Sequence, residues 1–307
     1  MSQKPKHVIS LLDFQPEEVE QIFAQSAEIK SKLLAGQRDP TLAGRVLTLL
    51  FEKPSLRTRN SFEAGMTQLG GGSIFLSTKD AGLQGRESLP DVAKVLSGYS
   101  DAIAMRTFSQ QLIEDVAAHS SCPVINALSD ESHPCQALTD LFTLQEVFGD
   151  LNGRKLVYVG DGNNVARSLA ILSSMMGVSL TVCAPAGYEL TTAVLNEVQT
   201  RVGACTVMQL SDPHKAVQDA DVVYTDVWAS MGQEAEADAR NKVFAPYQVN
   251  AELMSHAPAG CKFMHDLPAR RGTEVTDEVM DGPNSIVFQQ AENRMHLAKG
   301  LLAWLLT

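Results

Sequence analysis

The chain has 307 residues, 44% of them hydrophobic and 20% charged, which is typical of a soluble globular protein and long enough for two domains of about 150 residues. The formal net charge of −11 argues against a nucleic-acid partner, because binding to phosphates requires a basic face. No apolar run reaches the ~18 residues of a membrane span, and the first residues lack the apolar core of a signal peptide, so we expect no membrane association and a cytoplasmic location.

The cysteines and the regular elements indicate a reduced α/β protein. The five cysteines are scattered without a C-x-x-C pair, which favours free thiols over disulfides or a zinc site. After an amphipathic helix over residues 16–34, strands and helices alternate, which predicts βαβ units and a parallel sheet. The expected strands cover residues 45–51, 73–76, 102–106 and 124–127, and the helices between them cover residues 56–69, 89–99 and 110–119.

A second α/β series follows. A helix over residues 133–148 starts with His133 near its cap and Pro134 at its first position. We place the domain boundary here, so that residues 1–133 and 289–307 form one domain and residues 134–288 the other. Two open parallel-sheet α/β domains leave a cleft at their strand ends, where we expect the active site. The remaining strands are expected at residues 156–162, 179–184, 206–210 and 222–225, and the helices at residues 165–176, 191–202 and 291–306.

The segment F-E-K-P-S-L-R-T-R, residues 51–59, is the first motif with a chemical meaning. Pro54 ends a strand and Ser55 is a good N-cap, so the next helix exposes its free N–H groups and the positive end of its dipole. With Arg57, Thr58 and Arg59 beside it, this helix start suits an anion, and phosphate best of all. An ordinary capped helix with solvated arginines fits the pattern equally well.

The segment V-G-D-G-N-N-V-A resembles the G-x-G-x-x-A turn of dinucleotide-binding proteins. That turn needs an acidic residue about 20 residues further on, to hold the ribose hydroxyls. The strand there ends in Cys183, Ala184 and Pro185, so we do not expect a nicotinamide cofactor. The two asparagines, Asn163 and Asn164, either hold a polar ligand at the strand end or cap the following helix.

Four further segments combine polar side chains with strand or helix ends. In H-P-C-Q, His133 and Gln136 lie one helical turn apart and suit a carbonyl oxygen, although a helix cap is the simpler reading. In D-V-W-A-S-M-G, Asp226 follows a buried strand and leads into a charged loop over residues 233–242. H-D-L-P-A-R-R-G, residues 265–272, again follows a strand, and A-E-N-R places Arg294 at the start of the last helix.

Taken together and in order, these motifs resemble the carbamoyltransferases of the aspartate and ornithine class, and within that class those for ornithine. The resemblance rests on F-E-K-P-S-L-R-T-R, M-R-T, H-P-C-Q, D-G-N-N, D-V-W-A-S-M-G, H-D-L-P and A-E-N-R, and it covers essentially the whole chain. It implies transfer of the carbamoyl group of carbamoyl phosphate to the δ-amine of L-ornithine, giving L-citrulline and phosphate. It also implies no metal, no cofactor, and a homotrimer or a higher assembly of trimers.

Position by position, the resemblance implies roles for individual residues. Carbamoyl phosphate would be bound by Ser55, Leu56, Arg57, Thr58, Arg106, His133, Gln136 and Arg294. Ornithine would be bound by Asn164, Asp226, Ser230, Met231, Asp266 and Leu267. The catalytic groups among these would be Arg106, His133, Gln136, Asp266 and Arg294, and Gln84 would reach the site of a neighbouring subunit.

Two positions depart from the family pattern. Leu56 stands where most members have Thr, and Asp266 stands where the ornithine enzymes usually have Cys. A carboxylate beside an anionic substrate repels it unless it is protonated or turned toward an amine, so our hypothesis is that Asp266 faces the δ-amine. The alternatives are a carbamoyltransferase for another amine, such as acetylornithine, putrescine or aspartate, and a non-catalytic homologue that binds carbamoyl phosphate.

Overall fold

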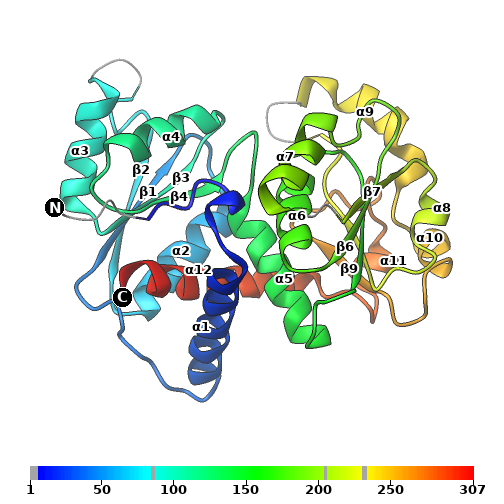
Figure 1. Cartoon of the computed structure of the whole chain (residues 1–307), viewed down its shortest axis with the longest axis horizontal. Helices are drawn as coiled ribbons and strands as arrows, with labels where there is room; N and C mark the ends of the chain where they lie inside the picture. Colours follow the sequence, from blue (N-terminus) through cyan, green and yellow to red (C-terminus); the bar gives the residue numbers. More distant parts are fainter. Residues whose placement is uncertain (1–5, 84–86, 204–205, 230–233) are drawn as a thin grey trace. The chain divides into compact units, whose positions relative to one another are not determined.

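The computed structural model describes residues 6–83, 87–203, 206–229 and 234–307 (Figure 1). It divides into two compact units: unit 1 is Met1–Phe142 with Glu292–Thr307, and unit 2 is Thr143–Ala291. Each unit contains its own parallel sheet. The division falls within helix α5 (Pro134–Phe148), whereas the sequence placed it at His133. Within the described ranges, no helix combines the length and apolar character that crossing a membrane requires.

Unit 1 is built on a sheet of four parallel strands in the order β2-β1-β3-β4. Helices α3 and α4 cover one face of it, where Leu50, Ile103 and Met105 of the sheet pack against Ile113 and Val116. Burying each such side chain stabilises the fold by roughly 1.5–3 kcal/mol. The strands are β1 (Val46–Phe51), β2 (Gly72–Ser77), β3 (Ala102–Arg106) and β4 (Val124–Leu128), and the helices are η1 (Leu11–Asp13), α1 (Pro16–Leu34), α2 (Leu56–Gln68), α3 (Leu89–Tyr99), α4 (Gln110–His119), the start of α5, and most of α12 (Val287–Leu306).

Unit 2 contains five parallel strands in the order β7-β6-β5-β8-β9. Buried side chains such as Val157, Val223 and Phe263 form its core together with Phe244 and Tyr247. The strands are β5 (Lys155–Val159), β6 (Ser179–Cys183), β7 (Val207–Leu210), β8 (Val222–Thr225) and β9 (Lys262–His265), and the helices are α6 (Asn164–Met175), α7 (Thr192–Val202), α8 (Pro213–Ala216), η2 (Glu234–Glu236), α9 (Ala237–Phe244), η3 (Ala245–Tyr247), α10 (Ala251–Ser255) and α11 (Asp277–Met280).

The prediction of two parallel-sheet α/β domains is confirmed, and most predicted elements lie within two residues of the observed bounds. Two boundaries were wrong. The strand expected over residues 156–162 ends at Val159. The last helix begins at Val287, four residues before the predicted start at Ala291, so Arg294 lies well inside it. Gln290 explains the earlier start, because its side chain accepts from the His265 N–H (3.0 Å) and donates to the Tyr224 hydroxyl (3.3 Å), which holds the first turn in place.

The charged segment after Asp226 was also predicted wrongly, as a loop. Its described part forms η2 and α9. Arg240, in α9, is only 4% exposed and binds both the Asp161 carboxylate and the Trp228 carbonyl oxygen. Its guanidinium also lies over the ring of Tyr188, 4.9 Å from the centroid. A buried cation with these partners holds the segment as a helix, which composition alone does not reveal.

Candidate active site

The polar motifs lie directly after the strands between which the strand order of each sheet reverses. In unit 1 the chain runs from β1 outward to β2 and then returns to β3, so the switch point lies between β1 and β3. In unit 2 it lies between β5 and β8. Open parallel sheets bind ligands at the carboxyl ends of such strand pairs. The segment after β1 and Arg106 of β3 belong to the first pair, and Asn163, Asn164 and Asp226 belong to the second.

The start of α2 in unit 1 has the predicted capped geometry. The Ser55 hydroxyl accepts a hydrogen bond from the Thr58 N–H (3.3 Å) and donates to the Thr58 hydroxyl (3.0 Å). The first N–H groups of a helix have no partner within the helix and carry a partial positive charge. Leu56 and Arg57 supply the first two helical positions, with the Leu56 side chain 72% exposed and Arg57 half-buried. Leu56 therefore offers its backbone here rather than its side chain.

Two guanidinium groups converge on the Thr58 hydroxyl. Arg106 donates to it over 3.3 Å, and Arg294 donates over 3.0 Å. Arg294 also donates to the Oε1 atom of Gln136. Thr58 is 1% exposed and Arg294 is 8% exposed, so this positive charge is concentrated in a site from which most water is excluded. Such a site favours an anionic ligand, because charge interactions strengthen as the local dielectric falls.

Arg106 takes its position from an irregularity in the sheet. The pairing of β3 with β4 shifts register between Met105 and Arg106, so that Arg106 pairs with Leu128. On its other side, Arg106 pairs with Phe51, the last residue of β1. A bulge of this kind re-aims the side chain at the strand end. It sends the guanidinium toward the start of α2.

Gln136 is oriented by a residue that the sequence motifs did not reveal. Its Nε2 atom donates to Oδ1 of Asp140 over 2.7 Å, and both side chains are fully buried. This bond fixes which end of the amide meets Arg294, because the Oε1 end is then left to accept from the guanidinium. The i,i+4 spacing of a Gln and an Asp on one helix was the available signal.

His133 precedes α5 and is 2% exposed. Burial, with added repulsion from the Arg294 and Arg106 charges, holds the pKa of His133 well below its usual value. The imidazole is therefore neutral at neutral pH and can donate one hydrogen bond without adding charge. A neutral donor beside two guanidiniums suits a carbonyl oxygen that gains negative charge during a reaction.

The turn before His133 is held by buried polar groups. Asn126 donates to Gln110 and to Ser132, at 3.0 Å each, and Ser129 donates to Gln110 over 2.6 Å. These side chains bring together β4, the start of α4 and the turn that leads into α5. No motif in the sequence pointed to these side chains. Their effect is to fix the backbone from which His133 projects.

Arg59 does not join this cluster, although the sequence placed it beside the anion site. Its guanidinium forms an ion pair with Glu63 at 2.9 Å and lies 3.8 Å from the centroid of the Phe75 ring. Glu63 is one helical turn further along α2, which is the favourable spacing for such a pair. The pair keeps Arg59 on another side of the helix from Thr58.

In unit 2, Asn163 and Asn164 take different roles. Asn163 caps α6, accepting from the N–H groups of Val165 and Ala166 at 3.0 and 3.1 Å. Its amide nitrogen donates to Asp226 over 2.8 Å. The cap alternative is therefore right for Asn163, which also positions Asp226. Asn164, the first residue of α6 and the predicted ligand, is half-buried.

The predicted residues Asp226 and Asp266 directly follow β8 and β9, and one carboxylate oxygen of each lies within 4.8 Å of the other and of a ring nitrogen of His265. Burial, followed by the charge of Asp266, raises the pKa of Asp226 well above its usual value, against the opposing effect of His265. Asp226 is buried and Asp266 is partly buried, so two negative charges this close repel each other. A cation that enters this site would offset that repulsion.

His265 contacts one member of the carboxyl pair, Asp266, and a third carboxylate, Glu274. Its Nε2 atom lies 3.1 Å from Glu274, which is fully buried, and its Nδ1 atom lies 3.3 Å from Asp266. Burial alone would lower the pKa of His265, but the hydrogen bonds to Asp266 and Glu274 and the nearby carboxylates outweigh it and raise the pKa to about 9. The backbone N–H of Leu267 also points at Nδ1 over 2.9 Å. The neutral ring accepts from Leu267, whereas the imidazolium donates to Asp266.

The remaining predicted residues are placed as follows. Leu267 packs partly buried against the unit 2 core and has a φ of 60°, in the left-handed region that non-glycine residues seldom adopt. Such backbone strain clusters at functional sites, which agrees with a ligand-binding role for this turn. Ser230, Met231 and Gln84 lie outside the described residues.

The glycine-rich turn after β5 has a packing explanation. A Cβ atom on Gly162 would lie 2.5 Å from the backbone nitrogen of Leu190 and 2.6 Å from the carbonyl carbon of Glu189. Gly162 also donates to the Tyr188 carbonyl oxygen over 2.7 Å. Glycine is therefore required by the close approach of the segment before α7, which needs no nucleotide.

Comparison with known proteins agrees with this division of polar groups. Residues 6–146 match the carbamoyl-P binding domain of aspartate/ornithine carbamoyltransferases, and residues 152–305 match their Asp/Orn binding domain. The chain is 50% identical over 299 residues to the ornithine carbamoyltransferase of Bacillus subtilis, covering 97% of this chain and 92% of that protein. It is 48% identical over 305 residues to that of Anoxybacillus flavithermus, covering 99% and 97%.

A solved structure gives the same result in three dimensions. The ornithine carbamoyltransferase of Pyrococcus furiosus superposes with a TM-score of 0.93 at 47% identity, over 99% of this chain and 97% of that one. The family models together span nearly the whole chain, and the relatives align over nearly their full length. Sequence motifs, fold and both domain matches therefore agree that the chain belongs to the aspartate/ornithine carbamoyltransferase family.

Proposed function

We propose that the protein transfers the carbamoyl group of carbamoyl phosphate to the δ-amine of L-ornithine, giving L-citrulline and phosphate. The observation that carries the proposal is the convergence of Arg106 and Arg294 on Thr58 at the start of α2, beside the buried His133. It occurs in a chain about half identical to ornithine carbamoyltransferases over nearly its full length.

In this proposal, unit 1 binds carbamoyl phosphate. The phosphate group lies at the start of α2, where it accepts from the Ser55 and Thr58 hydroxyls, from the first backbone N–H groups and from Arg57 and Arg106. Neutral His133 and Arg294 donate to the carbonyl oxygen. The Oε1 atom of Gln136 accepts from the carbamoyl nitrogen, in the orientation that Asp140 imposes.

Unit 2 binds ornithine in this proposal. Asp226 binds the α-amino group of ornithine, and the side-chain amide of Asn164 binds the same end of the substrate. Ser230 and Met231 are assigned to the same end by the family resemblance. Asp266 and the turn at Leu267 lie beside the δ-amine, and Asp266 accepts a hydrogen bond from it. Asp226 is buried against Asp266, so a bound ammonium group offsets the repulsion that the two carboxylates otherwise feel.

The reaction then proceeds by direct attack. The neutral δ-amine forms a bond to the carbonyl carbon, the carbon–oxygen bond to phosphate breaks, and the departing phosphate takes the proton that the amine loses. Arg57, Arg106 and Arg294 stabilise the negative charge on the tetrahedral oxyanion and on the leaving phosphate. An amine of this kind has a solution pKa near ~10.4, so the site must favour the uncharged form. Every step uses side chains and substrates alone.

We propose in addition that the protein works in the cytoplasm as a homotrimer or a higher assembly of trimers, with Gln84 reaching the site of a neighbouring subunit. The support is the family resemblance of the chain. Light scattering on the eluate of a sizing column tests the assembly, and a monomer that is fully active at the same concentration would contradict it.

Colorimetric detection of citrulline tests the proposed reaction. The purified protein is incubated with carbamoyl phosphate and ornithine, and in parallel with aspartate, putrescine and acetylornithine while phosphate release is measured. Turnover with ornithine alone supports the proposal. Turnover with another acceptor reassigns the substrate within the family, and tight carbamoyl phosphate binding without any turnover identifies a non-catalytic homologue.

A further inference from the structure

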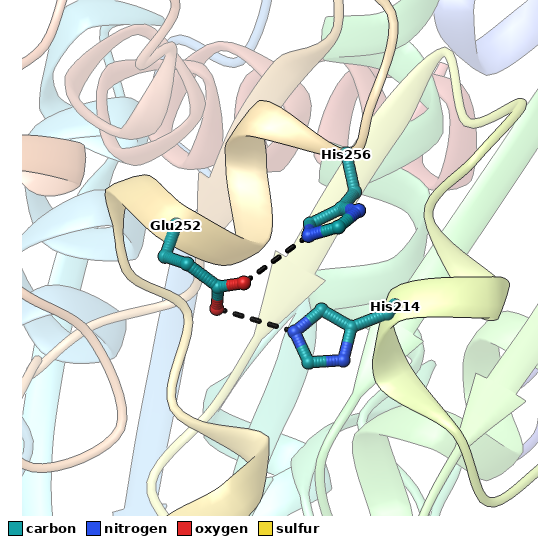
Figure 2. Close-up of side chains that lie close together, drawn as sticks. All are labelled: His214, Glu252 and His256. Atoms are coloured by element: carbon teal, nitrogen blue, oxygen red, sulfur yellow. Dashed lines mark hydrogen bonds and ion pairs between the residues drawn. The ribbon is translucent and has the colours of Figure 1, made fainter.

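Three side chains of unit 2 form a cluster separate from the residues discussed above (Figure 2). His214 belongs to α8, Glu252 belongs to α10, and His256 caps the C-terminus of α10. Nε2 of His214 lies 3.2 Å from Oε2 of Glu252, and Nε2 of His256 lies 3.1 Å from Oε1 of the same carboxylate. One carboxylate therefore lies between two imidazole nitrogens from two helices, as Figure 2 shows.

The spacing of these atoms matches that of ligands around one ion. One donor atom from each residue lies within 4.8 Å of the other two. With metal–nitrogen bonds of about 2.0–2.1 Å, two ligands of a tetrahedral zinc ion lie roughly 3.3 Å apart. The nitrogen–oxygen separations of 3.1 and 3.2 Å fall close to this value. A metal ion can replace the protons that now link the imidazoles to the carboxylate.

The donor types decide which ions fit. Two imidazole nitrogens and one carboxylate suit zinc, nickel and copper, whereas magnesium and calcium prefer oxygen ligands throughout. We propose that His214, Glu252 and His256 bind a divalent transition-metal ion of the zinc class. Three protein ligands leave the rest of the coordination shell to water.

Two features around the cluster support binding. Asp212 caps α8 and accepts from the His214 N–H over 3.1 Å, so the backbone of the ligand is held before any ion arrives. The three side chains are 46%, 66% and 43% exposed in the order His214, Glu252 and His256, which leaves them open to ions from solvent.

The three ligands come from two separate helices, because His214 belongs to α8 whereas Glu252 and His256 belong to α10 and its C-cap. An ion bound here would tie α8 to α10, which lie far apart in sequence, and binding should therefore stabilise the folded protein.

Zinc binding by the untagged, reduced protein tests the proposal. Equilibrium dialysis against zinc chloride should show zinc bound to the unchanged protein. The affinity for zinc should fall at least ~10-fold in His214→Gln and in His256→Gln. His119→Gln is the matched control, because His119 is also exposed on a helix and contacts only the Asp115 carbonyl oxygen among the contacts described. It should bind zinc as the unchanged protein does. Cobalt(II) should give visible absorption bands that both ligand variants lose.

A second cluster of possible ligands, Asp226, His265 and Asp266, provides the decisive comparison. If zinc binding is unchanged in the two histidine variants but lost in Asp266→Asn, the ion occupies the buried cluster and the proposal is overturned. Equal zinc affinity in all variants overturns it as well. Because His214 and His256 are exposed, their substitution should leave the fold intact, and the melting temperature without zinc checks this directly.

Discussion

Carboxylate oxygens of Asp226 and Asp266 lie within 4.8 Å of each other, although one residue follows β8 and the other follows β9. The two strands are neighbours in the sheet, and Thr225 pairs with His265, so each aspartate is the next residue beyond a paired position. Family resemblance assigns a cysteine to the position of Asp266. The carboxylate of Asp266 is therefore not isolated, because its charge acts on Asp226 and it lies 3.3 Å from Nδ1 of His265.

Removing the charge of Asp266 should move the pH dependence of ornithine use. Burial and then the charge of Asp266 raise the pKa of Asp226, so Asp266→Asn should lower that pKa. Asp226 then ionises at lower pH, and the acidic limb of the kcat/KM profile for ornithine should shift by about one pH unit toward acid. Asp266→Cys should shift it in the same direction. Asp219→Asn is the control, because Asp219 forms an exposed ion pair with Lys155. An unshifted pH profile in Asp266→Asn would contradict the assignment of Asp266 to the ornithine site.

His265 should make the stability of the protein depend on pH. Its pKa is raised from 6.5 to about 9, so its contribution is fully present below pH 6.5 and is lost as the pH rises through about 9. The difference in unfolding free energy between the unchanged protein and His265→Gln should therefore be larger at pH 6 than at pH 9.5, by roughly 3 kcal/mol. Urea unfolding at both pH values measures it. A difference independent of pH would falsify the charged state of His265.

Arg294 should not be replaceable by lysine. Its guanidinium donates to both Thr58 and Gln136, and a single ammonium group cannot reproduce this fork. Arg294→Lys should lower kcat/KM for carbamoyl phosphate by about 10²- to 10³-fold, the usual effect of losing one oxyanion donor. Arg45→Lys, in an exposed ion pair with Asp101 at 2.6 Å, should leave it nearly unchanged. Equal activities of the two variants would contradict the proposed role.

Asp140 should act as a positioning residue. In Asp140→Asn the new amide can donate to Gln136 and allow its side chain to flip, which would turn an N–H group toward Arg294. We expect kcat/KM for carbamoyl phosphate to fall about 10-fold while the KM for ornithine changes little. Asp115→Asn is the matched control, because Gln111 donates to Asp115 over 2.9 Å at the same spacing on an exposed helix. If both variants lose activity equally, the orientation of Gln136 is not the cause.

Local chemistry determined the helix starts, the fold class and several site residues of this protein without reference to the tertiary structure. Pro16, the Ser55 cap and Pro134 mark helix starts through the fixed φ of proline and the hydroxyl cap, and the structure has those helices at those residues. The alternation of apolar strands with helices was enough for two parallel sheets. The motifs also identified Arg106, His133, Gln136 and Arg294, which the structure brings into one cluster around Thr58.

Only the tertiary structure decided the interactions between residues distant in the chain. The pairing of Gln136 with Arg294 and the contact of Arg240 with Asp161 join segments far apart in sequence, and so does the meeting of His214 with Glu252. The early start of the last helix likewise depends on Gln290 reaching Tyr224. Backbone propensity acts over one or two helical turns, whereas buried charges and amides are placed by whichever partner the folded sheet brings near. For this reason the sequence identified the chemical groups, and the fold determined their protonation and orientation.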